Sequence, residues 1–555
     1  MIAMPVLSAA EMQTCDRVTT ERFGIPSIDL MRSAAGAVAA FAREHFPRAR
    51  RVTVLAGRGN NGGDGMMAAR LLAREGLRVT TLLLGDPRGL KGDTAQAWHE
   101  LTKPMRGAIH VVTTARELNQ HNEALATDLI LDALVGTGFT PPLKGLALAA
   151  LKWIGASRAP ILAIDLPSGW PADSTAATLT SRVFPADAVI TFTSPKPAHV
   201  FGALTRAWHQ AIVVAPIGSP DQAIVSRLHL GWSGAATSLT HAPRAAAANK
   251  GNFGHVLVVG GTFGSAGGKA GAPAMTALAA LRAGAGLVTA AVPTPALPIV
   301  STIAPELMTW PLEATAAGHI AAESLGSGKL SAILAGKTVL ALGPGLGQSP
   351  ETVKFATGLL SSTDLPAVID ADALNILAAK PTLLAKLARK GKRTLVLTPH
   401  PGEMARLTGA TVAKIQANRL EAARSFARRV GVTLVLKGAR TLIAHPDGRV
   451  AVNTTGNPAM AKGGSGDLLT GLVAGLLAQY PSDPARAVEA AVYLHGLAAD
   501  LAVRAGDEHT LLATDSLQHL SQAFRFYSQA TNGYVWLQGL PAGFSAAGPA
   551  CEAAR

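Results

Sequence analysis

The sequence contains few cysteines and few aromatic residues for its length. Only 2 of its 555 residues are cysteines, Cys15 and Cys551, and they lie near opposite ends of the chain. This number and spacing provide neither a disulfide framework nor a cysteine metal site, and they favour a reducing compartment. Aromatic residues make up 5% of the chain, too few to indicate a stacking platform for single-stranded nucleic acid.

Long uninterrupted hydrophobic runs are also missing. The N-terminal segment, MIAMPVLSAAEMQTCDR, has neither a basic start nor a sustained apolar stretch, so it is unlike a secretory signal peptide. The apolar stretch over residues 255–293 is interrupted by Lys269, Arg282 and many glycines. We therefore expect no membrane span and a cytoplasmic protein.

What the chain does contain is typical of a large globular protein. Hydrophobic residues make up 48% and charged residues 15%, and 555 residues are enough for two or more domains with separate cores. The net charge of +14 would favour an anionic partner, but the basic residues are scattered along the chain. This pattern predicts a solvated surface and no nucleic-acid partner.

Two series of alternating strands and helices predict two α/β domains. Runs such as RVTVLAG and DLILDALVG recur from residue 51, and a second series begins with HVLVVGG at residue 255. This rhythm is typical of parallel sheets covered by helices, and closely spaced late strands indicate a partly antiparallel edge in the second domain. The predicted organisation is a first domain over 1–218, a linker over 219–233, a second domain over 234–528 and a flexible tail over 529–555.

The first chemical constellation is the segment GRGNNGGDG, residues 57–65, between a strand and a helix. Its glycine spacing matches GxGxxG, which is typical of dinucleotide dehydrogenases. A dehydrogenase also needs an acid at the end of the next strand, and Asp86 fits this requirement only approximately. The segment further contains side-chain oxygens that a pyrophosphate turn does not need, on Asn60, Asn61 and Asp64.

Two later strand ends carry matching polar groups, Asp132 and the pair Asp165 and Ser168. Because the carboxyl ends of parallel strands share one crevice, these side chains can meet the glycine segment. Oxygens from Asn61, Asp132 and Ser168 would suit a monovalent or alkaline-earth cation, and the glycines of residues 136–138 would let backbone amides approach phosphate. The alternative is that the acids only cap helices and the glycines only form tight turns.

In this order, GRGNNGGDG, DALVGTGF and DLPSG resemble the NAD(P)H-hydrate epimerase family, over roughly residues 5–217. The resemblance implies a Rossmann-like α/β/α sandwich in three layers and a potassium ion held by Asn61, Asp132 and Ser168. Asp165 is the expected catalytic residue, because a carboxylate can deliver and recover a proton at the hydrated carbon. The residues implied to bind the substrate are Asn60, Asn61, Gly62, Gly63, Asp64, Gly136, Thr137, Gly138, Phe139 and Asp165.

The second constellation centres on NPAMAKGGSGDLLTG, residues 457–471, where glycines precede Asp467 and an apolar helical run. Amide N–H groups at the start of a helix stabilise charge on a transferred phosphoryl group, and an adjacent carboxylate can deprotonate the attacking hydroxyl. The absence of GxxxxGK[ST] excludes a P-loop. The alternative is that Asp467 is only a first-turn acid favoured by the helix dipole.

Other residues in the second half have equally simple alternatives. His400 could be a structural histidine in a proline-flanked turn, and Asp370 and Asp372 could only terminate a strand. The segment from Lys437 to Thr441 could simply be a hairpin turn.

As an ordered series, the motifs of the second half resemble the ribokinase-like superfamily and, more closely, the ADP-dependent NAD(P)H-hydrate dehydratases, over roughly residues 234–525. One departure is NKGNFG, residues 249–254, where His-Lys-Gly-Asp would be expected, so a contribution of Asn252 stays open. The resemblance implies that Ala272, Gly345, His400 and Asp467 contact the hydrated nicotinamide nucleotide. It implies that the adenine nucleotide is bound by Lys437, Gly438, Ala439, Arg440, Thr441 and Gly466.

Together the two resemblances imply repair of hydrated NADH and NADPH. Phosphorylation of the ring hydroxyl would convert it into a leaving group, and loss of phosphate would restore the ring at the expense of ADP, giving AMP. The epimerase would supply the S form from the R form. The expected ligands are NAD(P)H hydrates, ADP with magnesium, and potassium, and we expect a homo-oligomer. The alternatives are a bifunctional kinase for a small sugar or pyrimidine alcohol with a nucleotide-binding N-terminal module, and a first half that serves only as a binding module.

Overall fold

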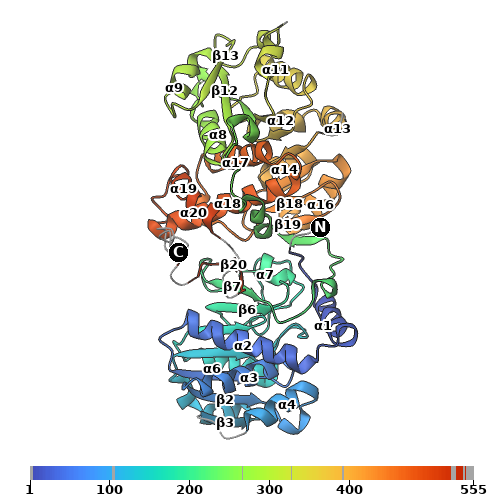
Figure 1. The fold of residues 1–555 in the computed structure, drawn as a ribbon, viewed down its shortest axis with the longest axis vertical. Coiled ribbons are helices and arrows are strands. Elements are labelled where there is room, and N and C mark those ends of the chain that lie inside the picture. The colour runs from blue at the N-terminus through green and yellow to red at the C-terminus, as the bar shows by residue number, and fades with distance from the viewer. Residues whose placement is uncertain are drawn as a thin grey trace. The chain divides into compact units, whose positions relative to one another are not determined.

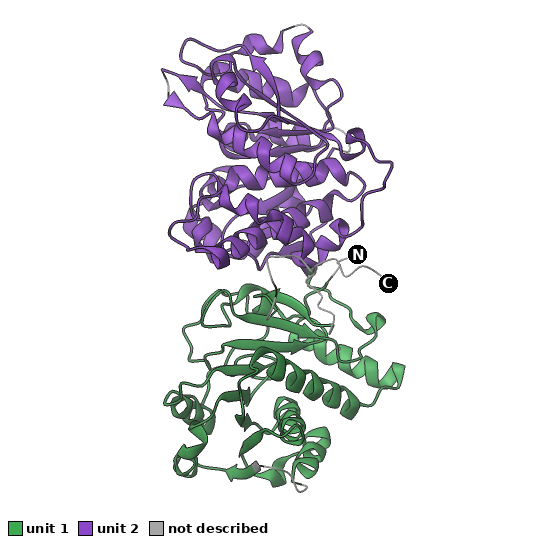
Figure 2. Cartoon of the chain, turned by 60° about the vertical axis from the view of Figure 1, so that its left-hand side comes forward, with its two compact units in different colours: residues 1–230, 527–545 green, residues 231–526, 546–555 purple. Residues whose placement is uncertain are grey.

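The computed structural model describes residues 4–102, 107–265, 267–326, 328–389, 393–526, 533–541 and 544. The chain divides into two compact units (Figure 2). Unit 1 comprises residues 1–230 and 527–545, and unit 2 comprises residues 231–526 and 546–555. Across the described residues no helix combines the length and the apolar character needed to cross a bilayer.

Unit 1 is built on an eight-stranded sheet with the order β20-β7-β6-β5-β4-β1-β2-β3 (Figure 1). All neighbouring strands are parallel except β20, which pairs antiparallel with β7. Strands β4 to β7 are buried along their whole length, as their continuous apolar runs predict. The strands are β1 Arg51–Ala56, β2 Arg78–Leu84, β3 Gly107–Val112, β4 Leu129–Ala133, β5 Ile161–Ile164, β6 Ala188–Phe192, β7 Ala211–Ala215 and β20 Val535–Gln538.

Helices alternate with these strands, as the pattern of the sequence predicts. The first helix begins with a capping box between Ser8 and Glu11 and ends at Gly24, which has φ 71°. The helices of unit 1 are α1 Ala9–Phe23, α2 Ser27–His45, α3 Asn60–Arg74, α4 Gly92–Leu101, α5 Ala115–Gln120, α6 Gly145–Ile154 and α7 Pro197–Phe201. Short 3₁₀ helices are η1 Pro87–Gly89, η2 Asn122–Leu125 and η3 Asp221–Ala223.

The prediction of a flexible tail over 529–555 is wrong for its middle part. Strand β20 extends the sheet of unit 1, and Trp536 is only 2% exposed. Its ring lies 6.1 Å from the ring of Phe41 on α2, and Tyr534 donates a hydrogen bond to the Ala37 carbonyl. Burial of these aromatic rings orders a segment whose sequence has no period of its own. The rest of the predicted tail, with Cys551, lies outside the described residues apart from 533–534, 539–541 and 544.

The segment 219–233, predicted as a linker, contains regular structure as well. It includes η3, the strand β8 (Leu230–Trp232) and the first residue of a 3₁₀ helix, η4. Strand β8 lies at the edge of the sheet of unit 2, beside β19. Indole Nε1 of Trp232 donates to the hydroxyl of Thr454 at 2.8 Å, so β8 is tied into that unit by a buried hydrogen bond.

Unit 2 contains a ten-stranded sheet with the order β13-β12-β9-β14-β15-β16-β17-β18-β19-β8. The strands from β13 to β17 are parallel, and β17, β18 and β19 pair antiparallel, which confirms the predicted antiparallel edge. The strands are β9 His255–Val259, β12 Leu287–Pro293, β13 Met308–Leu312, β14 Val339–Leu342, β15 Ala367–Ile369, β16 Leu395–Leu397, β17 Thr433–Leu436, β18 Leu442–Ala444 and β19 Val450–Val452. Strands β10 Phe263–Gly264 and β11 Gly267–Gly268 form a separate hairpin.

The helices of unit 2 pack closely where small residues meet. A β-carbon added at Gly471 in α17 would lie 2.1 Å from the carbonyl oxygen of Thr276 in α8, so this approach requires glycine. The helices are α8 Gly271–Arg282, α9 Leu297–Ser301, α10 Lys329–Leu334, α11 Pro350–Ser361, α12 Ala371–Ala378, α13 Pro381–Arg389, α14 Pro401–Thr408, α15 Val412–Ala417, α16 Arg419–Val430, α17 Ser465–Gln479, α18 Pro484–Ala505, α19 Asp515–Gln518 and α20 Leu520–Arg525. Short 3₁₀ helices are η4 Ser233–Thr240, η5 Lys250–Phe253, η6 Thr294–Ala296, η7 Ala322–Leu325 and η8 Pro458–Met460.

Candidate active sites

In unit 1 the strand ends converge on Asp165, which directly follows β5 and has φ 65°. Its Oδ1 accepts hydrogen bonds from the hydroxyl of Thr191 at 2.9 Å and from Nζ of Lys196 at 3.0 Å. Its Oδ2 accepts the backbone N–H of Thr137 at 3.1 Å. Two segments that are far from Asp165 in the sequence, at residues 137 and 191–196, therefore hold its carboxylate.

Asp165 and Lys196 form a buried ion pair, with side chains that are 10% and 2% exposed. Burial alone would raise the pKa of Asp165, but Lys196 and then His199 outweigh it, so this pKa is lowered. Burial and Lys196 lower the pKa of His199 to about 4, so the imidazole is neutral at physiological pH. Nδ1 of His199 accepts the N–H of Lys196, so Nε2 carries the proton and donates to the Asp165 carbonyl at 2.7 Å.

The predicted glycine segment is not an open loop: residues Asn60 to Asp64 form the first turn of α3. A β-carbon added at Gly62 would lie 1.9 Å from the Gly57 carbonyl oxygen, so only glycine permits this turn. Asp64 is half-buried, and burial, followed by repulsion from Asp165, raises its pKa well above the ordinary value. The segment thus brings an acid, not only amides, to the crevice.

The turn after β4 reaches the same place. A β-carbon added at Gly136 would lie 3.1 Å from Oδ2 of Asp165 and 3.2 Å from Cβ of Asn61. The amide of Phe139 closes this turn by donating to the Gly136 carbonyl at 3.0 Å. The structure therefore brings together the predicted substrate-binding segments 60–64 and 136–139 with Asp165.

Two of the three predicted cation ligands, Asp132 and Ser168, are directly hydrogen-bonded, and Asn61 lies against the turn that follows Asp132. Ser168 donates its hydroxyl to Oδ1 of Asp132 at 2.6 Å and its backbone N–H to Oδ2 at 2.8 Å. Asn61 is 9% exposed, and among the described residues neither atom of its side-chain amide has a hydrogen-bond partner. The unpartnered amide oxygen of Asn61, the carboxylate of Asp132 and the hydroxyl of Ser168 are hard oxygen ligands, so these residues fit a potassium ion.

The dehydrogenase alternative is disfavoured by the surroundings of Asp86. This side chain, which is 40% exposed, caps η1 and forms a salt bridge with Arg88 at 2.6 Å. The acid expected to bind a ribose is thus occupied by a local partner two residues away.

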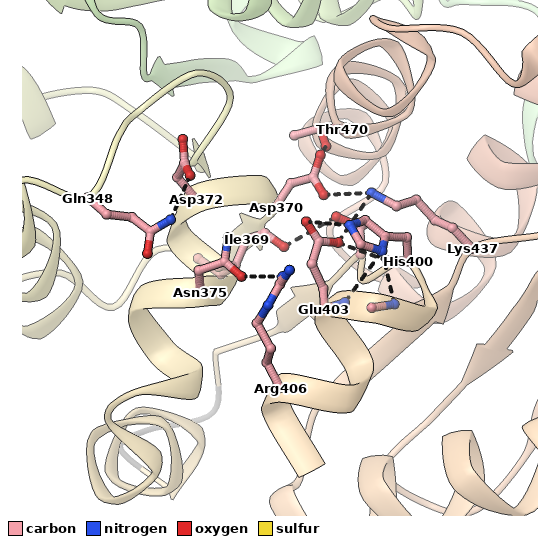
Figure 3. A network of polar contacts seen from close by, with 12 residues as sticks. Gln348, Ile369, Asp370, Asp372, Asn375, His400, Glu403, Arg406, Lys437 and Thr470 are labelled. Carbon is pink, nitrogen blue, oxygen red and sulfur yellow. Dashed lines mark hydrogen bonds and ion pairs between the residues drawn. The ribbon is translucent and has the colours of Figure 1, made fainter. Parts of the chain in front are cut away.

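In unit 2 the central contact is between Asp370, at the end of β15, and Lys437, at the end of β17 (Figure 3). Nζ of Lys437 donates to Oδ1 of Asp370 at 2.9 Å, and the hydroxyl of Thr470 in α17 donates to Oδ2 at 2.9 Å. Burial alone would lower the pKa of Lys437, but Asp370 and then Glu403 outweigh it, so this pKa is raised. Asp370 therefore does more than terminate a strand.

His400 lies at the N-terminal cap of α14 and forms a capping box with Glu403. Its Nδ1 accepts the N–H of Gly402 at 3.0 Å, and burial followed by Lys437 lowers its pKa. Oε2 of Glu403 lies 3.9 Å from Nζ of Lys437, and burial raises the pKa of Glu403. The structural role considered for His400 is present, and its Nε2 still lies at the edge of the charged cluster (Figure 3).

Asp467 lies in the first turn of α17 and is half-buried. Burial and then repulsion from Asp370 raise its pKa to about 6, although Lys437 opposes the shift. A β-carbon added at the neighbouring Gly466 would lie 3.4 Å from Nζ of Lys437. The helix start, the lysine and two acids thus occupy one place at the carboxyl edge of the sheet.

The remaining residues predicted to contact the hydrated nucleotide adjoin this cluster. A β-carbon added at Gly345 would lie 3.2 Å from Cβ of Ala272. The hydroxyl of Thr276 lies 3.0 Å from the carbonyl oxygens of both Ala272 and Asp467, which links α8 to α17. Asp372 accepts the N–H of Gly347 at 2.9 Å and so supports the loop that contains Gly345.

The segment from Lys437 to Thr441 is indeed the turn of a hairpin, between β17 and β18. Its conformation is unusual, because Gly438 has φ 140° and Arg440 has φ 54°. Nη1 of Arg440 donates to the Thr454 carbonyl at 3.0 Å, and Nη1 of Arg419 donates to the Ala439 carbonyl. The turn is therefore held in one shape with Lys437 facing the start of α17.

The departure at Asn252 has a local explanation. Oδ1 of Asn252 accepts the N–H of Asn249 at 2.8 Å within η5, which precedes β9. This position is at the amino end of a parallel strand, whereas the charged cluster lies at the carboxyl ends. An asparagine supplies the same acceptor as an aspartate for this turn.

Several polar residues of these sites were not predicted from the sequence, among them Lys196, Thr191, Glu403 and Asp16, whose charge interacts with Lys196 and Asp165. Thr191 lies near the end of β6 and Lys196 lies just after this strand, where the rule that located Asp165 would also have found them. Glu403 lies three residues after His400 in a helix start and could have been found as a capping residue. Asp16 lies on α1, ahead of the alternating pattern, and no signal in the sequence indicates it.

Comparison with known proteins gives matches to both halves of the chain. The profile of a family described as NAD(P)H-hydrate dehydratase matches residues 256–523, and that of a family described as YjeF-related protein N-terminus matches residues 27–198. The chain is 41% identical to a bifunctional NAD(P)H-hydrate repair enzyme from Moorella thermoacetica, over 94% of this chain and 97% of the relative. It is 34% identical to the repair enzyme of the same description from Escherichia coli, over 93% of each chain. Among solved structures, an ADP/ATP-dependent NAD(P)H-hydrate dehydratase from Bacillus subtilis, crystallised with ATP and Mg²⁺, is 31% identical, with a TM-score of 0.43 over 53% of this chain and 96% of that chain.

Proposed function

Since the chain belongs to the family of bifunctional NAD(P)H-hydrate repair enzymes, we propose that its two units carry the two successive steps of that repair. Unit 1 interconverts the R and S hydrates of NADH and NADPH. Unit 2 dehydrates the S form to NAD(P)H at the expense of ADP, giving AMP and phosphate. One configuration is consumed, and the epimerase on the same chain replenishes it.

The dehydration is supported above all by Asp467 in the first turn of α17. Its pKa of about 6 makes it mostly a carboxylate at neutral pH and still basic enough to take a hydroxyl proton. The backbone amides in the first turn of α17, which has no side-chain cap, and the ammonium of Lys437, beside Gly466, lie where they would stabilise a phosphoryl group in transfer. This arrangement suits a kinase-like first step.

The second step follows from the chemistry of the hydrated ring. The hydroxyl of the hydrate becomes a phosphate ester, and the ring nitrogen pushes the phosphate out as the C–O bond breaks. Loss of a proton from the neighbouring ring carbon then restores the double bond. We propose that Ala272, Gly345 and His400 bind the hydrate at this position, and that the nucleotide lies against the turn from Lys437 to Thr441 and against Gly466.

Magnesium is proposed to arrive with the phosphates of the nucleotide. Among the described residues no group of three or more histidine, cysteine or acidic side chains could hold a metal. Magnesium bound to nucleotides needs only one or two protein carboxylates, so the buried acids Asp370 and Glu403 fit this requirement.

For unit 1 we propose Asp165 as the catalytic residue, with the segments 60–64 and 136–139 around the substrate. Asn61, Asp132 and Ser168 are proposed to hold potassium. Bound there, the ion would supply a fixed positive charge beside the substrate oxygens. A homo-oligomer and a cytoplasmic location, inferred from the sequence, stay predictions.

The decisive experiment follows the absorbance of the dihydronicotinamide ring. Each hydrate epimer is incubated separately with ADP or ATP, with and without potassium. We expect absorbance to return with the S form directly, and with the R form only while unit 1 is active and potassium is present. A kinase for small alcohols would restore no absorbance and would release a stable phosphoester instead.

A further inference from the structure

The crevice of unit 1 gathers three acidic side chains around one buried lysine. Asp165 is paired directly with Lys196, whereas Asp16 on α1 and Asp64 on α3 interact with this pair through their charges only. Asp16 and Asp64 are half-buried, and Oδ1 of Asp16 has no hydrogen-bond partner among the described residues. Only one of the three acids thus has a cationic partner.

Epimerisation at the hydrated carbon needs both a proton acceptor and a proton donor. This carbon carries a hydroxyl and is bonded to the ring nitrogen. When an acceptor takes the hydroxyl proton, the bond from carbon to nitrogen can break with its electron pair moving to nitrogen, which takes a proton from the donor. The product is an open-chain aldehyde, and closure on its opposite face inverts the centre and returns both protons. No oxidant or reductant is needed.

The geometry around Asp165 suits the acceptor. Oδ1 is filled by Lys196 and Thr191, so Oδ2 is the oxygen that faces Gly136 and the substrate segments. The imidazole of His199 is hydrogen-bonded to the backbone of both Asp165 and Lys196, so the two residues of the ion pair are held in position.

The geometry around Asp64 suits the donor. It lies three residues after Asn61 on the same face of α3, and Asn61 adjoins Gly136 in the crevice. Burial raises the pKa of Asp64, repulsion from Asp165 and Asp16 adds to this shift, and Lys196, which is bonded to Asp165, opposes it only in part. A carboxyl group placed among carboxylates keeps its proton.

We propose that Lys196 sets different roles for these acids. Its ion pair with Asp165 keeps Asp165 as the proton acceptor, and Asp64, which has no such ion pair, is the proton donor. This inference rests on the proposed epimerase function of unit 1. In it Lys196 is a positioning residue that acts through Asp165, while Asp64 contacts the reacting atoms.

The pH dependence of epimerisation follows from the charges that face Asp165. These are Lys196 ahead of α7, His199 within it, Asp64 on α3 and Asp16 on α1. Lys196 has a larger effect than His199 on the pKa of Asp165, and His199 is neutral above about pH 4, so Lys196 is the main cation that holds Asp165 ionised. Asp16, which lacks a bonded lysine, has a pKa of about 6, raised chiefly by burial.

The first test replaces Lys196 by Met, which keeps the length and removes the charge. Loss of the cation is expected to raise the acid limb of the epimerase pH profile by about 1 to 3 units. Lys196→Arg keeps the positive charge but changes the shape of the side chain. The epimerase kcat should therefore fall, while the acid limb of the pH profile should not shift. The dehydratase activity of unit 2, on the same chain, is the internal control and should not change. An unshifted limb in Lys196→Met would overturn the role of Lys196.

Removing one partner of a buried ion pair strongly destabilises a protein, so folding must be checked. The double variant Lys196→Met with Asp165→Asn removes both charges. It should unfold close to the wild-type temperature and have no epimerase activity. If Lys196→Met does not fold, the Arg variant decides: a shifted limb would refute the proposal, and a lower kcat with an unshifted limb would support it.

The second test replaces Asp64 by Asn, which keeps the shape and cannot transfer a proton. Epimerase kcat should fall about 10² to 10⁴-fold, and the alkaline limb of the profile should disappear. Retention of the alkaline limb at an undiminished rate would show that another group is the donor. If the wild-type chain does not epimerise the hydrates at all, the proposed function fails first, and this outcome is distinct from either result above.

Discussion

The C-terminal strand β20 makes a sharp prediction about the stability of unit 1. Trp536 is 2% exposed and packs beside the stacked rings of Phe41 and His45, at 6.1 Å from each ring. A buried Trp covers about 150–250 Å², and at about 25 cal/mol per Å² this is worth about 4–6 kcal/mol. Nε1 of Trp536 has no hydrogen-bond partner among the described residues, and burying this unpaired group costs the folded state about 1–3 kcal/mol. Removal of the indole also removes this cost. Trp536→Ala should therefore destabilise unit 1 by about 3 kcal/mol.

The two activities of the chain provide the assay. Residual epimerase and dehydratase activities are measured after brief heating at rising temperatures, together with unfolding in urea. We expect the epimerase of Trp536→Ala to be lost at a lower temperature while the dehydratase keeps its wild-type midpoint. Trp536→Phe keeps most of the apolar ring area and should destabilise unit 1 much less. Val225→Ala, at a position 61% exposed in unit 1, is the control and should change nothing. An unchanged epimerase midpoint in Trp536→Ala would refute the structural role of β20.

Three further variants test unit 2 and the packing of the helices. Asp467→Asn should lower the dehydratase rate by about 10² to 10⁴-fold, measured by the return of absorbance, with epimerase activity retained. The same variant should be more stable than wild type at pH 7.5 but not at pH 4. The reason is that the folded-state pKa of Asp467, about 6, exceeds its unfolded value, so wild-type stability falls as pH rises between the two; thermal unfolding at both pH values checks this. Gly471→Ala should destabilise unit 2 by about 1–3 kcal/mol, because its β-carbon would overlap the Thr276 carbonyl. Gly36→Ala, in α2 with open space around it, should instead stabilise by about 0.5–1 kcal/mol, and urea unfolding compares the two.

Much of both sites could be predicted from the sequence because parallel sheets place strand ends together. Asp165 and Asp370 each follow a short β-branched run, and the topology makes their convergence with the glycine segments a general consequence. Lys437 and Asp467 were likewise identified from motifs at a strand end and a helix start. The predicted antiparallel edge at β17 to β19 followed from closely spaced strands.

Partners fixed by long-range packing could not be predicted in this way. Lys196 is 31 residues from Asp165, and its sequence surroundings do not reveal that it is buried against that acid and no other. The pKa of Asp165 is lowered and that of Asp64 is raised, and this difference depends on which of the two acids is bonded to Lys196. Neighbours in space, not in sequence, decide the charge of each group.

The sequence by itself determined the two α/β units, the order of their strands and helices, and the side chains at the strand ends, because these depend on local periodicity and short motifs. The tertiary structure alone decided that residues 535–538 complete the first sheet and that Lys196 forms its ion pair with Asp165 and not with Asp16 or Asp64. Both outcomes depend on burial, which arises only when segments distant in the chain exclude water from one another.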